Sequence, residues 1–420
     1  MSMSQNKIYK FYLFLPILII LLPLFPTFFS INLGAQIIFA FEISMVIGLG
    51  IIGLYKFEFT LIAKAYCLLF LLITMISLFC DIFNEYIVIK DTFEIIKPIA
   101  FLLFYTFYRK SNLRIERLEI ATLHSIIFVF IVLAIYSIIE YLLPDIITPI
   151  SLLLYKRDTL LVLEGKAIGS FSQTYDFAYI LILPIMYFFI SLLRHFTLKY
   201  FLFFLALFFA FLLTQSRSMY ISLVICLFLI YCLPYFHRNI ASSIKITGIV
   251  IVIIFIIAYI YIVYQDNLRH MFPYAFYGFE SIWEGESNSV NTRREQIEWA
   301  LANNHLVLIG GGISKDLKML ESFYSLYYYR YGIIGVCIYL IIPIITAYAA
   351  YQISKKEYNN KKLSSFYLSL CVFYLVTPIA LSSSCHQDTP KISFLFYGLI
   401  GLVYNKYFTL KATMIKKSIK

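Results

Sequence analysis

The fold of this chain is decided by runs such as FYLFLPILIILLPLFPTFF at 11–29, which contains no charged residue. About 20 apolar residues are enough for a helix to cross the hydrocarbon core of a bilayer. The chain of 420 residues is 61% hydrophobic and only 14% charged, whereas a soluble domain has about 25% charged residues. Because the ten-residue alternation of a membrane β-barrel is also missing from the sequence, we predict an all-α, polytopic integral membrane helix bundle.

Similar runs recur along the chain and predict about twelve transmembrane helices. We expect the first run to be a membrane span rather than a cleaved signal, because it is long and no small-x-small site follows it. No repeat or low-complexity linker divides the sequence, so residues 1–420 are predicted to form a single membrane domain. The predicted spans are 11–29, 31–55, 65–83, 87–108, 120–143, 173–193, 200–213, 218–236, 246–264, 325–350, 363–381 and 391–408.

Two polar stretches, 144–172 and 265–324, interrupt this pattern and are predicted to be loops on one side of the membrane. The basic residues indicate which side, because Lys and Arg concentrate in cytoplasmic segments. Of 34 such residues, 21 share the side of the N-terminus: eight up to Arg117, eight between Arg194 and Lys362, and five from Lys406 onward. Both termini are therefore predicted to be cytoplasmic and both loops external. The net charge of +11 thus reflects topology, and no nucleic acid partner is predicted.

Arginines in the external segments are the first candidates for binding. Arg217 lies in the turn LTQSRSM at 213–219, where it would either bind lipid headgroups or form a fixed cation at the mouth of an outward cavity. The polar residues beside it favour the cavity. Arg293 and Arg294 precede a predicted amphipathic helix at 296–303. Although Arg294 is spaced to pair with Glu298, guanidinium groups also suit bidentate phosphate contacts, so the three arginines suggest a diphosphate ligand.

The end of the long loop holds further candidates. The glycines at 310–312 permit positive φ and close approach of a ligand, although a turn before a helix is the simpler explanation. Glu321 precedes the next apolar run, where it would act either as a carboxylate at a helix N-terminus or as a general base. The tyrosines from Tyr324 to Tyr331, with Arg330 among them, are predicted to form an aromatic belt at the membrane interface.

Charged residues within predicted spans are few, and each is a functional candidate. Glu42 and Glu140 stand alone, and each is predicted to bond to a neighbouring helix or to line a cavity. His386 and Asp388 are too few ligands for a metal site, and the seven cysteines have no metal-binding spacing, so no metal and no cofactor is predicted. The charges of the fourth span, expected to neutralise one another on a stripe facing the bundle, are Lys90, Asp91, Glu94 and Lys97.

Four pieces of the second half, in order, resemble motifs of the bacterial O-antigen polymerase and O-antigen ligase superfamily, whose members are integral membrane glycosyltransferases. They resemble the family's Gly-Thr-Phe, its Leu-Thr-x-Ser-Arg turn, its Arg…Trp…Ala…Gly-x-Gly run in the large outer loop, and the block that opens the next span. The first five spans match nothing diagnostic. The pieces cover about 170 residues and are Gly169-Ser170-Phe171, Leu213 to Arg217, Arg293 or Arg294 with Trp299, Ala300 and Gly310-x-Gly312, and Glu321-Ser322-x-Tyr324 with Tyr331 to Gly335.

Departures from the family pattern favour one branch. Glu321-Ser322 stands where the ligase branch typically has His-Asn, which favours the polymerase (Wzy-type) branch. The family's Pro-Asn pair is replaced by the stretch 173–176, which reads Gln-Thr-Tyr-Asp. The Arg-x10-Gly pattern of some polymerase loops is also missing, because eleven residues separate Arg157 from Gly169.

The resemblance implies a GT-C-like, metal-independent enzyme in the bacterial inner membrane that polymerises oligosaccharide repeats linked to undecaprenyl diphosphate. The product would be a surface polysaccharide such as O-antigen or capsule. Arg217 with Arg293 or Arg294 would hold the diphosphate leaving group, and Glu321 would take the proton from the attacking hydroxyl. Partners would be membrane lipid, a flippase and a chain-length regulator. Residues implied to contact substrate are Arg157, Gly310, Gly312, Tyr324 and Arg330.

Two alternative functions remain open at this point. One is an O-antigen ligase, which joins a finished glycan to its final carrier. The other is a flippase or secondary transporter, which twelve spans and the charges at 90–97 would suit. Carriers commonly have two related halves, however, and here one half holds a loop of about sixty residues without a counterpart in the other.

Overall fold

The computed structural model describes residues 4–24, 31–155, 166–233, 263–285, 287–313 and 317–418. Within these ranges the secondary structure is helical and contains no β-strand, which confirms the all-α prediction. Arg157 and most of the ninth predicted span, 246–264, lie outside the described residues. Each of the other predicted spans overlaps a helix.

Long helices follow the predicted spans in chain order: α1 (Gln5–Leu21), α2 (Ile31–Ile51), α3 (Leu61–Phe83), α4 (Ile96–Arg109), α5 (Ile115–Leu142), α8 (Thr174–Arg194), α9 (Leu198–Leu213), α10 (Arg217–Cys232), α14 (Phe323–Lys356), α15 (Lys361–Ala380) and α16 (Ile392–Ser418). By length and composition, α3, α5, α8, α14 and α15 can each cross a membrane. Shorter apolar helices include α9 and α10. These helices are those of a helical membrane protein, in agreement with the predicted class.

Both predicted loops contain helices. The stretch 144–172 begins with α6 (Pro144–Leu154), and the stretch 265–324 contains α12 (Pro273–Trp283) and α13 (Asn288–Asn303). Proline opens both α6 and α12, where its missing N–H would have no helical partner in any case. The predicted helix at 296–303 is therefore too short, because it starts two turns earlier, at Asn288. Its first half is polar, so the apolar periodicity used for the prediction missed it.

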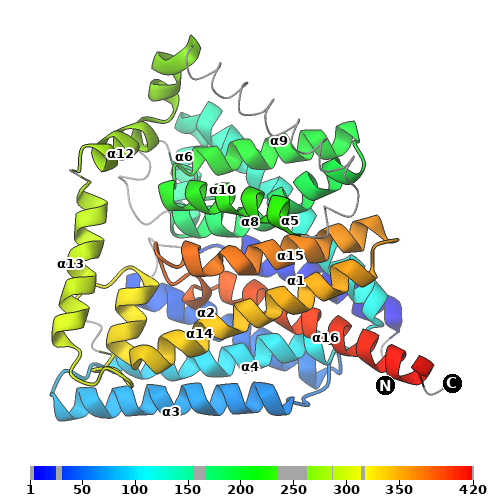
Figure 1. The fold of residues 1–420 in the computed structure, drawn as a ribbon, viewed down its shortest axis with the longest axis horizontal. Helices are drawn as coiled ribbons and strands as arrows, with labels where there is room; N and C mark the ends of the chain where they lie inside the picture. Colours follow the sequence, from blue (N-terminus) through cyan, green and yellow to red (C-terminus); the bar gives the residue numbers. More distant parts are fainter. Residues whose placement is uncertain are drawn as a thin grey trace.

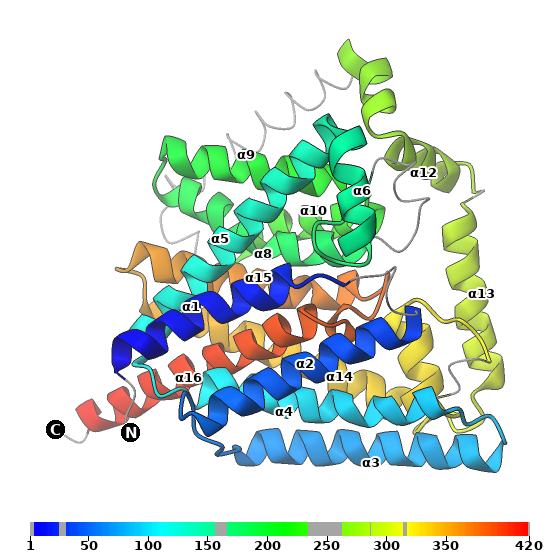
Figure 2. The ribbon, with the colours of Figure 1, turned by 180° about the vertical axis from the view of Figure 1, so that it is seen from behind.

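The long helices lie side by side, and the chain's two ends lie together at one end of this bundle (Figure 1). At the opposite end, α13 runs across the tips of the long helices, and the view from behind shows the same arrangement (Figure 2). The described parts of both predicted loops thus share one end of the bundle, which we call the loop end. The core lies around α8, which is buried along nearly its whole length and packs against α9 and α15.

The fourth predicted span, 87–108, is not one continuous helix. A 3₁₀ helix, η1 (Ile89–Ile95), precedes α4, and Pro98 lies in the first turn of α4, where proline is tolerated. The Asp91 carboxylate accepts the backbone N–H of Val88 at 3.1 Å and so holds the start of η1. Lys90, Asp91 and Glu94 therefore lie in η1, before the long helix, and Lys97 lies in the first turn of α4.

The chain breaks α14 at Gly332, which has φ 63° and ψ −168°. A side chain there would bring its Cβ within 2.3 Å of the Leu308 backbone, so only glycine fits. The break frees backbone groups that a continuous helix would pair, and neighbouring segments replace the lost partners. The carbonyls of 328, 329 and 330 accept hydrogen bonds from Asn304 Nδ2, the Gly311 N–H and Ser77 Oγ, while the N–H groups of 333 and 334 donate to the carbonyls of Val307 and Leu308.

Candidate functional site

The helix α13 turns polar residues toward the protein. Ser289, Arg293 and Gln296 follow one another at intervals of four and three residues, which places them on one helix face, and Trp299 and Ala300 continue it. Gln296 and Ala300 are buried and the other three are partly buried. A surface helix ordinarily turns apolar residues inward, so this inward polar face is unusual for packing and typical of a binding surface. Residues exposed on the opposite face include Val290, Arg294, Ile297, Glu298 and Leu301.

Arg217 lies at the start of α10 and reaches this face. Its guanidinium donates to the Gly278 carbonyl at 2.8 Å and to Ser289 Oγ at 2.9 Å. It also lies 5.3 Å from the ring centre of Tyr274, and Lys166 Nζ lies 3.0 Å from the same ring centre. A cation above an aromatic ring is stabilised by the ring's quadrupole. Two positive charges therefore meet at one tyrosine at the loop end of the bundle.

The turn before Arg217 has a structural role that the sequence did not reveal. Gln215 is buried, and its side-chain oxygen accepts the backbone N–H groups of Tyr274 and Ala275 at 3.0 and 3.3 Å. These N–H groups open α12 and have no partner within that helix. Gly278 completes the fit, because a Cβ at this position would come within 2.5 Å of the Arg217 guanidinium. The polar turn thus fixes α12 over Arg217.

Arg293 and Glu321 both lie near Tyr175, the second residue of α8. Both charges act electrostatically on the Tyr175 hydroxyl. The backbone N–H of Glu321 donates to Gln296 Oε1 at 3.0 Å, while the Glu321 side chain is exposed. Arg293 Nε is buried without a hydrogen-bond partner among the described residues. A buried donor without a partner is unfavourable, so a ligand with acceptor oxygens would stabilise this arginine.

The two neighbouring arginines point in different directions. Arg294 is on the outward face of α13, where its side chain is 78% exposed and its Nε donates to Glu298 at 2.9 Å. The predicted pairing along the helix is therefore confirmed for Arg294. The structure places Arg293 on the inward face of α13 and Arg294 on the other side of the helix.

Of the remaining predicted site residues, Gly310 and Gly312 are buried and Tyr324 is partly buried. Gly310 and Gly312 have φ values of 92° and 134°, and a Cβ on Gly310 would come within 2.2 Å of the Arg330 carbonyl oxygen. The Tyr324 hydroxyl donates to the Pro378 carbonyl at 2.6 Å. The structure thus gives these residues packing partners within the protein, and a role in substrate contact stays a prediction for them.

Arg330 belongs to a buried network of charges at the loop end. Glu94 lies 2.5 Å from Lys97 Nζ and 3.6 Å from the Arg330 guanidinium, and Lys97 also binds Asp388 at 2.7 Å. The two positive and two negative charges of this network balance. The Tyr327 hydroxyl donates to Asp388, and the Tyr331 hydroxyl donates to Glu94. The predicted neutralisation within 90–97 is confirmed for Glu94 with Lys97, and the side chain of Lys90 lies outside the described residues.

A histidine–carboxylate pair was missed by the sequence analysis. His386 Nδ1 lies 2.8 Å from Asp176 Oδ1, and both side chains are buried. Nδ1 donates this hydrogen bond when the Asp176 carboxylate is ionised, because an ionised carboxylate can only accept. The imidazole also stacks on Tyr179, with ring centres 4.6 Å apart. The pair ties α8 to the turn after α15 and so fixes the adjacent Tyr175; 210 residues separate the partners, and no local pattern could have connected them.

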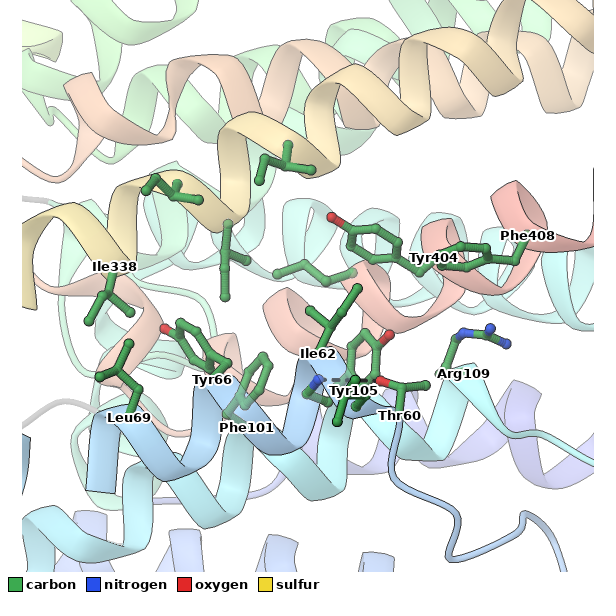
Figure 3. A pocket seen from close by; sticks show the side chains of 16 residues that line it. Thr60, Ile62, Tyr66, Leu69, Phe101, Tyr105, Arg109, Ile338, Tyr404 and Phe408 are labelled. Carbon is green, nitrogen blue, oxygen red and sulfur yellow. Dashed lines mark hydrogen bonds between the residues drawn. The ribbon is translucent and has the colours of Figure 1, made fainter. Parts of the chain in front are cut away.

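An apolar groove of about 570 Å³ lies between α3, α4, α14 and α16 (Figure 3). Its wall is aliphatic and aromatic, and Arg109 lies at the edge nearest the chain termini. Toward the loop end, rings at Tyr66, Phe70 and Tyr339 pack together, with Phe70 and Tyr339 centred 4.8 Å apart.

Among the described residues, no group of three or more His, Cys, Asp or Glu side chains is arranged to hold a metal ion. No protein-family model matches the chain, and no curated protein matches it in sequence. The site at the loop end is accordingly interpreted from its own geometry.

Proposed function

We propose that this protein polymerises oligosaccharide repeats linked to undecaprenyl diphosphate, by glycosyl transfer at the outer face of a bacterial inner membrane. The observation that carries the proposal is the inward polar face of α13. Along it, Ser289 contacts Arg217, Arg293 offers an unpaired donor, and Gln296 binds the backbone of Glu321. Two cations along the same helix face as one exposed carboxylate suit transfer from a diphosphate leaving group, because they would stabilise the charge that develops on it.

The spacing of these groups fits the reaction. Seven residues separate Ser289 from Gln296, which is about 10 Å along a helix. Arg293 lies between them, about one turn from each. A diphosphate held by Arg217 and Arg293 would thus leave its sugar near Glu321. Arg293 takes this role in preference to Arg294, because Arg294 faces outward and pairs with Glu298.

In the proposed reaction, a hydroxyl of the acceptor glycan attacks the anomeric carbon of the donor sugar. The new C–O bond forms as the bond between that carbon and the diphosphate oxygen breaks, and undecaprenyl diphosphate leaves. Glu321 accepts the hydroxyl proton, for which it must lie about 3 Å away in the bound state. Arg217 and Arg293 stabilise the negative charge that develops on the diphosphate.

The proposal includes the predicted topology, with about twelve spans and both termini in the cytoplasm. The loop end would then face the periplasm, where a flippase delivers both lipid-linked substrates. A chain-length regulator is the other partner implied by such a polymerase. Glu94 and Lys97 find their partners within the protein, so this pair gives no support to a transport pathway.

The test is the glycan made by a strain that lacks this protein. If the protein is a polymerase, surface lipid of the deletion strain should carry one repeat unit and no long chains. Returning the intact gene should restore the long chains. Long lipid-linked chains without surface glycan would instead indicate a ligase. Repeats accumulating in the inner leaflet would indicate a flippase. An unchanged distribution of chain lengths would contradict all three.

A further inference from the structure

A polar pocket of about 650 Å³ opens at the far end of α13, beside the end of α3. Ligand sites in proteins commonly enclose ~300–1,000 Å³, so the pocket has the size of a small-molecule site. Its lining combines aromatic rings, amides and an imidazole, and the residues that supply these groups are Asn84, Tyr86, Trp299, Asn303, His305 and Tyr329.

The described lining suits a ligand that presents both an apolar face and hydroxyl groups. Among the described residues, no Lys, Arg, Asp or Glu lines the pocket. The rings of Trp299 and Tyr329 lie 4.9 Å apart and give it an aromatic wall. Such a wall packs against the C–H face of a sugar ring, while the amides of Asn84 and Asn303 can both donate to and accept from hydroxyl groups. Neutral sugars present these two surfaces together.

The position of the pocket relates it to the proposed reaction. Trp299 follows Gln296 by less than one turn of α13, and Gln296 binds the backbone of Glu321. From Ser289 onward, this face of α13 therefore presents first the contact with Arg217 and then Arg293. The contact with the Glu321 backbone follows, and the pocket comes last. The diphosphate of the donor would occupy the arginine side of Glu321, which leaves the pocket on the opposite side for the acceptor.

The break in α14 fixes the pocket wall. Tyr329 lies just before the break, and its carbonyl accepts the N–H of Gly311, another lining residue, at 2.7 Å. Asn303 Nδ2 donates to the Trp299 carbonyl at 2.8 Å within α13. Hydrogen bonds to backbone groups thus hold Tyr329, Gly311 and Asn303 in place. The pocket is therefore formed before a ligand binds, which favours affinity.

We propose that this pocket binds the neutral sugars of the acceptor glycan, an inference that rests on the proposed polymerase function. A bound sugar would direct a hydroxyl toward Glu321 and would make the pocket the part of the protein that selects the acceptor. Arg217 and Arg293 would not contribute to this binding.

The pocket can be tested by fluorescence, because the chain has two tryptophans. In W283F the remaining Trp299 reports on the pocket, and Trp283 is 94% exposed, so its replacement is harmless. The probe is a set of neutral oligosaccharides released from the host's own surface polysaccharide by mild acid. We expect a saturable change in Trp299 emission that inorganic pyrophosphate does not compete away.

Two variants then separate binding from folding. N303A and H305A, each in the W283F protein, should weaken the apparent affinity about fivefold to tenfold, as expected for losing one hydrogen bond of ~1 kcal/mol. H270A is the matched control, because His270 is an exposed histidine that does not line the pocket, and it should bind as the W283F protein does. Unchanged affinity in both variants would overturn the proposal.

The outcomes distinguish this inference from the function on which it rests. If the deletion strain loses long chains but the released oligosaccharides cause no saturable change, the polymerase proposal stands and the pocket proposal is wrong. If the oligosaccharides bind through Asn303 and His305 but the deletion strain keeps its long chains, the pocket is a sugar site and the polymerase proposal is wrong.

Discussion

The side chain of Gln296 accepts the backbone N–H of Glu321 at 3.0 Å, across 25 residues of chain. Through this bond α13 holds the start of α14 and leaves the Glu321 carboxylate exposed, while Arg293 lies on the same inward face of α13. One helix thus holds both the proposed base and a cation. Because this hydrogen bond uses the backbone N–H of Glu321, the Glu321 side chain can be replaced without removing the bond.

Replacing Glu321 by glutamine should abolish polymerisation and leave the fold intact. The amide keeps the size of the side chain but cannot accept a proton at neutral pH. Loss of a general base lowers rates by roughly 10²–10⁴-fold, so long chains should disappear from gels of surface polysaccharide. E298Q is the control, because Glu298 is an exposed carboxylate on the outward face of α13. A normal ladder in E321Q at normal protein level would remove Glu321 from the mechanism.

Reversing the charge of Arg217 should also remove the long chains. Stabilisation of charge in a transition state by one group contributes about 10²–10³-fold, and a carboxylate at this position would in addition repel the diphosphate. R294E is the comparison, since Arg294 is exposed and bonds to Glu298; we expect it to keep the normal ladder. R217K should recover only part of the activity, because lysine lacks the two-pronged geometry. Equal ladders in R217E and R294E would contradict the assignment.

The glycine turn should matter for stability rather than for chemistry. In G310A the new Cβ meets the Arg330 carbonyl at 2.2 Å and the backbone has positive φ, so we expect a loss of about 2–4 kcal/mol from strain and overlap. G285A has the same unfavourable φ but open space around the Cβ, and should lose only ~1 kcal/mol. Thermal unfolding of the purified variants in detergent measures the difference. A melting temperature for G310A no lower than that of G285A would refute the close contact.

The predicted orientation can be checked with cysteine labelling. A membrane-impermeant maleimide should label W283C at the loop end in intact cells, and should label N359C, between α14 and α15, only after permeabilisation. Labelling in the reverse order would place the loop end in the cytoplasm.

Native Cys385 provides an internal negative control for that experiment. Burial raises the pKa of the Cys385 thiol well above its usual value, so less of the reactive thiolate is present at neutral pH. It should stay unlabelled from both sides until the protein is denatured. Labelling of Cys385 in the folded protein would show that the turn after α15 opens.

Features encoded in short segments were accessible from the sequence. Apolar runs located the long helices, and local spacing gave the pairs Arg294–Glu298 and Glu94–Lys97. The contact of Asp176 with His386 depends on how α8 packs against the turn after α15, which no local spacing reports. The glycines at 310–312 matched a binding motif, and the structure shows in addition that Gly310 and Gly311 contact the residues just before the break in α14, because close approach serves a backbone as well as a ligand.

The inward face of α13 also limits how this chain can change in length. Each residue turns a helix by about 100°, so removing one residue between Ser289 and Trp299 would rotate Trp299 out of the pocket while Ser289 stayed at Arg217. A substitution in this stretch affects one contact, whereas an insertion or deletion breaks the shared register of all of them.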